Sequence, residues 1–212
     1  MLSQIVGLLG CSCELLSLIA CINQLRTLRS LSEATPESHL STLGFHLRTR
    51  LLNLQQEVFI VPGEAAGTIS HQRIHLTAQF YLLAAILYLY DTCPACAPPL
   101  TEQPDHTMRA LPSIPFLVRQ CFMLLKQMDV CTSPWPLFIL ASNVVEDGDR
   151  IEVMRAFERG ARERKVGNYE ILTGLVKAIW KREDLCADEG KESRISDWRD
   201  LIDGEKGMPS FI

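Results

Sequence analysis

One apolar stretch decides the fold, Phe80-Tyr81-Leu82-Leu83-Ala84-Ala85-Ile86-Leu87-Tyr88-Leu89-Tyr90. A helix with this sequence is apolar on nearly every side, so other helices must surround it. The stretch is also well short of the roughly 18–20 residues that a membrane-spanning helix needs. We therefore predict a buried central helix from about Ser70 to Tyr90, in a chain without a membrane segment.

The sequence on both sides of this stretch has helical periodicity. Apolar residues recur at steps of three and four, and we find no strong alternating strand pattern and no fixed-period repeat. The chain is therefore predicted to be all-α, a single-domain array of about seven to eight packed helices over residues 1–212. The other predicted helices cover about 15–28, 36–58, 112–128, 134–145, 150–165 and 168–180, and 93–107 is a loop rich in proline.

Composition and charge exclude two classes of protein. The chain has 212 residues, 47% of them hydrophobic, and a net charge of only −4, which excludes a disordered polypeptide. The most basic segment, Arg159–Lys165, follows Glu158 and contains Glu163, so we interpret it as a solvated helix face. Since there is no excess of positive charge to neutralise phosphates, we predict no direct contact with nucleic acid.

Motifs for catalysis and metal binding are missing from the sequence. GxSxG, GxxxxGK[ST], GxGxxG and HExxH do not occur. His71 and His75 are four residues apart without a supporting third ligand, so we interpret them as partly exposed helix residues. Glu146-Asp147-Gly148-Asp149 lacks the ligand spacing of a calcium loop and suits a helix N-terminus. We predict no catalytic, cofactor-binding or metal residues, and no cofactor.

The eight cysteines are interpreted mainly as buried free thiols in a reducing compartment. Cys93-Pro94-Ala95-Cys96 supplies only half of a tetrahedral zinc site, and no βαβ pattern surrounds it, so we predict a turn at Pro94. Leu18–Cys21 looks like a lipoprotein cleavage site, although no Lys or Arg precedes Ile5. A secreted or lipid-anchored helical protein is therefore kept as an alternative.

Several segments, taken in order, resemble a known family. They are similar to the opening helix, the central helix and the Trp-Pro helix of the fungal-specific transcription factor domain, which occurs in six-cysteine binuclear zinc cluster regulators. The resemblance covers essentially the whole chain. It is carried by Leu9–Leu25, Ala78–Tyr90, Pro134–Ser142 with Asp149-Arg150 following, Asp197-Trp198-Arg199 and the terminal Phe211-Ile212.

The resemblance implies a transcription-regulatory domain in the nucleus. Its partners would be proteins of the transcription machinery, a second copy of itself, or a small-molecule effector. A zinc cluster needs six thiolates in a basic segment, whereas Cys11 and Cys13 are separated by one residue and Cys93 with Cys96 stands alone. We therefore expect a domain without its own DNA-binding module, either a piece of a longer product or a stand-alone regulatory module.

The resemblance supplies structural positions and no ligand-contacting residue. Trp135 and Pro136 are expected to open a helix, with Trp135 anchored in the core. Asp149 and Arg150 are expected to open the next helix, with Arg150 paired to a carboxylate or a helix end, and Trp198 marks the closing segment. The competing class is a helical enzyme, which would need carboxylates converging in an apolar pocket.

Overall fold

The computed structural model describes residues 2–6, 10–31, 37–58, 68–98, 111–164 and 168–188. Within these ranges the backbone forms seven α-helices, one 3-10 turn and three short strands, which confirms the predicted all-α class. The helices belong to two compact units, residues 1–128 and residues 129–212.

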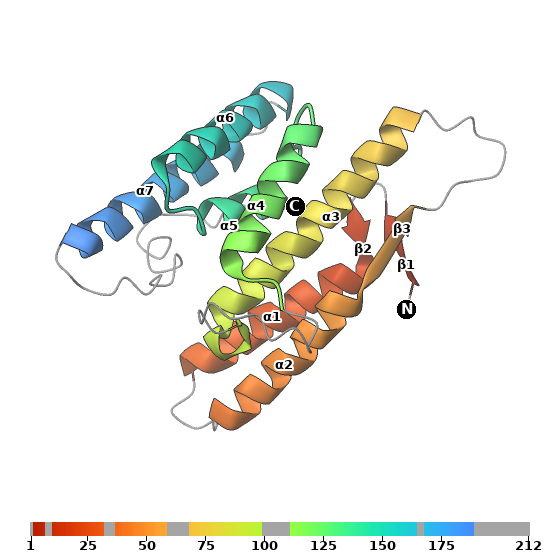
Figure 1. Cartoon of the computed structure of the whole chain (residues 1–212), viewed down its shortest axis with the longest axis vertical. Helices are drawn as coiled ribbons and strands as arrows, with labels where there is room; N and C mark the ends of the chain where they lie inside the picture. Colours follow the sequence, from red (N-terminus) through yellow and green to blue (C-terminus); the bar gives the residue numbers. More distant parts are fainter. Residues whose placement is uncertain are drawn as a thin grey trace. The chain divides into compact units, whose positions relative to one another are not determined.

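The central helix of the first unit is α3 (Thr68–Thr92), which contains the predicted span from Ser70 to Tyr90. It contacts α1 (Cys13–Leu31), α2 (Glu37–Asn53) and α4 (Ile114–Gln127), and Figure 1 shows these helices alongside it. Burial of one large apolar side chain stabilises a fold by about 1.5–3 kcal/mol, so this helix dominates the core. Its buried residues include Phe80, Ala84, Ala85, Ile86, Leu87, Tyr88, Leu89 and Tyr90.

A small sheet in the first unit includes the end of the helix predicted over 36–58 and part of the segment compared with an opening helix. Strands β1 (Leu2–Val6), β2 (Cys11–Ser12) and β3 (Gln55–Val58) form a sheet in the order β2-β1-β3. The β1–β2 pair is antiparallel, with Ile5 opposite Ser12, and the β1–β3 pair is parallel. The helix predicted to continue to Val58 therefore ends at Asn53, and the segment compared with an opening helix from Leu9 becomes helical only at Cys13.

Non-local contacts explain why periodicity misses this sheet. Gly10 turns the chain with a φ of +71°, and a Cβ there would lie 2.8 Å from Thr77 Cγ2, so glycine suits both the turn and the space. Ser12 Oγ then accepts a hydrogen bond from Leu15 N at 3.2 Å and caps α1. Gln56 joins the sheet to its neighbours, because its side chain accepts from Ser12 N and donates to Ala78 O. These partners lie up to 44 residues away.

Proline and serine start the helices in the way the sequence predicts. Ser113 caps α4, with Pro115 in the first turn, and Ser133 precedes α5 (Pro134–Ala141). Helix α5 ends at Ala141, earlier than the predicted Val145. The reason is local, since Ser142 Oγ hydrogen-bonds the carbonyls of Phe138 and Ile139 and competes with continued helix.

The second unit packs α5 against α6 (Asp147–Arg164) and α7 (Asn168–Asp188). Val153, Ala156, Phe157 and Gly160 are buried on α6, whereas Ile151 is 53% exposed. The face of α6 that is buried is thus set by α5 and α7. The predicted closing segment, residues 195–202 with Trp198, and the C-terminal Phe211-Ile212 lie outside the described residues.

Candidate functional site

The structure places four of the five motif residues near the starts of two helices in the second unit. Pro136 is buried at the start of α5, and Trp135 beside it is half-buried. Asp149 and Arg150 lie in the first turns of α6. The buried indole of this unit belongs to Trp180 on α7, and Trp198 is outside the described residues.

Arg150 is the centre of the most connected polar cluster that the structure describes in the second unit. Its Nη1 donates to Asp184 Oδ1 at 2.9 Å and to Oδ2 at 3.1 Å. Its Nη2 lies 3.7 Å from Glu183 Oε2, and Asp147 Oδ1 lies 3.9 Å from Nη1. The predicted pairing of Arg150 with a carboxylate is thus observed, and the short contacts come from α7.

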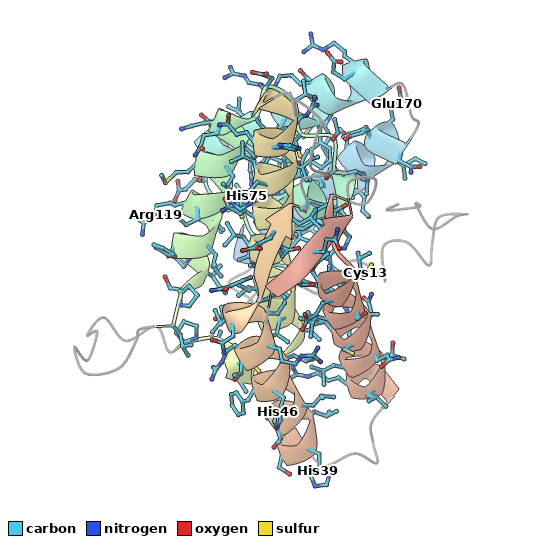
Figure 2. The ribbon with its side chains drawn as sticks, turned by 90° about the vertical axis from the view of Figure 1, so that its right-hand side faces the viewer. Cys13, His39, His46, His75, Arg119 and Glu170 are labelled. Atoms are coloured by element: carbon cyan, nitrogen blue, oxygen red, sulfur yellow. The ribbon has the colours of Figure 1, made fainter. Side chains whose placement is uncertain are left out.

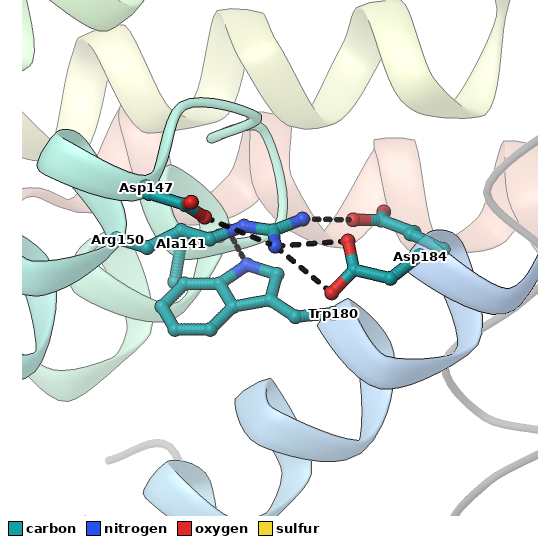
Figure 3. Close-up of polar contacts among 6 residues, drawn as sticks. Ala141, Asp147, Arg150, Trp180 and Asp184 are labelled. Atoms are coloured by element: carbon teal, nitrogen blue, oxygen red, sulfur yellow. Dashed lines mark hydrogen bonds and ion pairs between the residues drawn. The ribbon is translucent and has the colours of Figure 1, made fainter. Parts of the chain in front are cut away.

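An aromatic ring covers the same guanidinium. Arg150 Cζ lies 5.3 Å from the centroid of the Trp180 ring, within the range of a cation–π contact. Trp180 Nε1 donates to the carbonyl of Ala141 at 2.9 Å, and so satisfies an acceptor at the end of α5. Figure 3 shows the guanidinium between the Trp180 indole and the Asp184 carboxylate. The cluster therefore ties three helices together.

Burial and charge act in opposite directions on this cluster. The Arg150 side chain is only 13% exposed, whereas Asp184 is 60% exposed. Burial raises the pKa of Glu183 above its ordinary value, Arg150 opposes that rise, and Asp184 adds to it. Arg150 Nε is buried without a hydrogen-bond partner among the described residues. The carboxylates of the cluster pair with the guanidinium, so their interactions are those of a packed ion-pair cluster.

Sequence reasoning found Arg150 but missed its partners. Trp180, Glu183 and Asp184 lie in the second half of α7, and only folding brings them to the start of α6. A usable signal was the grouping of an aromatic residue and two acids within five residues of one helix. That signal is weak without a structure, because such groupings are common on solvent-facing helices.

The histidines within the described ranges do not gather into a metal site. His39 and His46 point outward from α2, and His75 lies on α3, away from them (Figure 2). His75 Nε2 is 2.9 Å from Gln79 Nε2 on its own helix. In the part of the chain that the structure describes, no group of three or more His, Cys, Asp or Glu could hold a metal ion.

The CxxC segment forms the predicted turn, and it also brings its two sulfurs together. Pro94–Cys96 is a 3-10 turn, η1, directly after α3. Cys96 Sγ donates to Cys93 Sγ at 3.1 Å, and both side chains are buried. Four further cysteines are free in the first unit, of which Cys11 and Cys121 are buried and Cys13 is exposed. Cys93 with Cys96 is the closest pair of sulfurs among the contacts described.

Comparison with known proteins adds one positive finding. Residues 2–212 match the family model described as the fungal specific transcription factor domain. No curated protein matches the chain, and no solved structure matches it. Among the described helices, none combines the length and apolarity required to cross a bilayer.

Proposed function

Because the chain belongs to the fungal-specific transcription factor domain family, we propose that it regulates transcription through protein or small-effector contacts. The partners in this proposal are proteins of the transcription machinery or a second copy of the chain. The observation that carries the proposal is the extent of the family match, which covers residues 2–212. The proposal places the chain in the nucleus and gives it neither an enzymatic reaction nor direct DNA binding.

The arrangement of the cysteines supports the proposed lack of DNA binding. A binuclear zinc cluster needs six thiolates close together, because each Zn–S bond is about 2.3 Å long. Here Cys11 precedes α1 and Cys121 is on α4, and none of the eight cysteines, all of which lie in the described ranges, forms a disulfide. Within the described ranges, no set of three metal-binding side chains converges.

The surface charge of α6 supports the same proposal. Its exposed face alternates bases and acids, with Arg155 and Arg159 beside Glu158 and with Glu163 one turn further along. A phosphate backbone is bound by a surface with a clear excess of positive charge. A face of mixed charge with a net chain charge of −4 suits contact with protein better.

A tethering experiment tests the regulatory role. The chain is fused to an unrelated sequence-specific DNA-binding domain upstream of a reporter gene in fungal cells. We expect reporter expression to change at least severalfold relative to that domain alone. An Arg150→Ala fusion, weakened in the second unit, should lose part of the effect, whereas a fusion with Lys177→Ala, an exposed position on α7, should keep it. Unchanged expression from a fusion that accumulates normally would contradict the proposal.

A binding experiment on the purified chain tests the proposed lack of DNA binding. Fluorescence anisotropy with a pool of random-sequence duplexes should show no binding that persists at physiological salt. Elemental analysis of the same protein should show no stoichiometric zinc. Selection of one duplex sequence from the pool, with zinc at two ions per chain, would contradict the proposed lack of DNA binding.

A further inference from the structure

We propose that Cys93 and Cys96 form a dithiol site that a small hydroperoxide oxidises to an intramolecular disulfide. The proposal rests on the geometry of the first unit and is independent of the proposed regulatory role. It assigns a modification site to the turn at the end of α3, which the sequence alone predicts only as a turn.

The spacing of the sulfurs is the first argument. Cys93 Sγ and Cys96 Sγ are 3.1 Å apart, and a disulfide bond is about 2.05 Å long. The sulfurs therefore have to approach by only about 1 Å. The turn holds them at this spacing, since Cys96 N donates to Cys93 O at 2.8 Å and Ala97 N donates to Pro94 O at 3.0 Å.

The second argument is that neighbouring helices fix the turn from both ends. Arg29 of α1 donates to the carbonyl of Thr92 at 2.7 Å, just before the first cysteine. Arg48 of α2 donates to the carbonyl of Cys96 at 2.8 Å. On the α2 side, Gly44 leaves room for the sulfurs, because a Cβ there would lie 2.8 Å from Cys93 Sγ and 2.5 Å from Cys96 Sγ.

The environment favours an anion on one of the two sulfurs. The hydrogen bond from Cys96, with the positive charge of Arg29, lowers the pKa of Cys93. The same hydrogen bond, with burial, raises the pKa of Cys96. Cys93 is therefore the nucleophile, and Cys96 keeps its proton until it resolves the intermediate. A thiolate is the reactive form of cysteine.

Two buried hydroxyls without partners belong to residues that closely precede the pair in the chain. Among the described residues, three buried side-chain polar atoms have no hydrogen-bond partner, and two of them are the hydroxyls of Tyr90 and Thr92. Both residues belong to the last turn of α3, and the pKa of Tyr90 is raised by burial and by Cys96. Buried hydroxyls without partners are rare in folded proteins, so the hydrogen bonding at this end of α3 is incomplete among the described residues.

Burial decides the class of oxidant. Cys93 is only 4% exposed and Cys96 is fully buried, so a bulky disulfide has no approach to either sulfur. A small hydroperoxide fits this restriction. The Cys93 thiolate attacks one peroxide oxygen and the O–O bond breaks, which leaves Cys93 as a sulfenic acid. The departing hydroxide or alkoxide takes up the proton that the Cys93 thiol released to solvent when it ionised, and leaves as water or an alcohol. The Cys96 sulfur then attacks Cys93, the S–O bond breaks and water leaves, so the two sulfurs are oxidised by two electrons and the peroxide is reduced by two.

Peptide mapping of the folded wild-type chain tests the proposal. The reduced protein is treated with an equimolar amount of hydrogen peroxide, the remaining thiols are alkylated after denaturation, and the digest is analysed by mass spectrometry. We expect the Cys93–Cys96 disulfide as the main product, with the other six cysteines still alkylated, and its reversal by dithiothreitol. Treatment with glutathione disulfide should give at least tenfold less of the same bond.

Variants assign the two roles. Cys96→Ser should stop at a sulfenic acid on Cys93, trapped by dimedone, and Cys93→Ser should slow oxidation at Cys96 at least tenfold. Cys121→Ser, which removes a buried thiol of the same unit, should leave the disulfide unchanged. The proposal is overturned if the wild-type chain leaves both thiols alkylated after peroxide, if Cys13 is oxidised first, or if the main product is a mixed disulfide with glutathione. The wild-type result stands even where a variant fails to fold.

Discussion

The side chain of Arg150 connects helices α5, α6 and α7. The sequence alone predicts only that Arg150 pairs with a carboxylate or a helix end. The guanidinium is the group best suited to this role, since it is planar, always charged, and able to bind a carboxylate while stacking on an aromatic ring. Here it binds Asp184 and Glu183 and lies over Trp180, which in turn binds the end of α5. Removal of the guanidinium breaks all three contacts together.

Arg150→Ala is expected to destabilise the second unit by about 2 kcal/mol. This figure is discounted for solvent screening, because Asp184 is 60% exposed. Arg150→Lys keeps the charge but loses the two-pronged geometry, and should cost about 1 kcal/mol. All three tryptophans belong to residues 129–212, so urea unfolding followed by tryptophan fluorescence reports on this unit. The exposed Arg155→Ala on the same helix is the control, and equal midpoints for both alanine variants would refute the role given to Arg150.

At the level of helices, two glycines separate the effect of tertiary packing from that of intrinsic helix propensity. Gly44 and Gly174 both lie inside helices, α2 and α7. A Cβ on Gly44 would meet both sulfurs of the CxxC turn at less than 3 Å, whereas a Cβ on Gly174 would meet nothing within 4 Å. The same substitution therefore has opposite expected effects at the two positions.

Gly44→Ala should destabilise the first unit by about 1–3 kcal/mol, because the turn must move away from α2 to admit the methyl group. Gly174→Ala should stabilise its helix by about 0.5–1 kcal/mol, since alanine loses less backbone entropy than glycine. Urea unfolding followed by circular dichroism at 222 nm (a standard helix signal) measures both changes in one buffer. A stabilised Gly44→Ala variant would mean that the turn does not pack on α2 as described.

At the level of the whole molecule, buried thiols are expected to lower the free energy of unfolding at alkaline pH. Burial raises the pKa of both Cys11 and Cys121 from the ordinary value of 9.0 to about 12. Between these values the unfolded chain loses a proton that the folded chain keeps. The folded state therefore binds more protons, and the free energy of unfolding falls as the pH rises.

We expect a fall of up to about 1.4 kcal/mol per pH unit for each of these two thiols above pH 9. The measurement is urea unfolding under reducing conditions across that pH window, each variant being compared with itself at neutral pH. Cys121→Ala should show a shallower fall than the wild type, and Cys21→Ala, which removes a half-buried thiol of α1, should keep the wild-type slope. Identical slopes for the wild type and Cys121→Ala would disprove this source of the pH dependence.

Local pattern was sufficient for the helical class and for several helix starts. Phe80–Tyr90 is apolar on nearly every side and is largely buried, and Pro115 and Pro134 lie in the first turns of α4 and α5. The beginning of α6 and its arginine could be anticipated for the same reason. These features depend on residues that are neighbours in the chain.

Contacts between distant residues decided the rest. Gln56 forms part of a sheet because its partners are Ser12 and Ala78, and Ile151 remains exposed because α5 and α7 cover another face of α6. Asp184 reaches Arg150 across 34 residues, and the CxxC turn meets Gly44 of α2 only in the folded unit. Hydrophobic periodicity identifies the apolar face of one helix, but it does not specify which other helix packs against that face. The helices are therefore a property of the local sequence, whereas the ion-pair cluster and the contacts that α1 and α2 make with the CxxC turn exist only through packing.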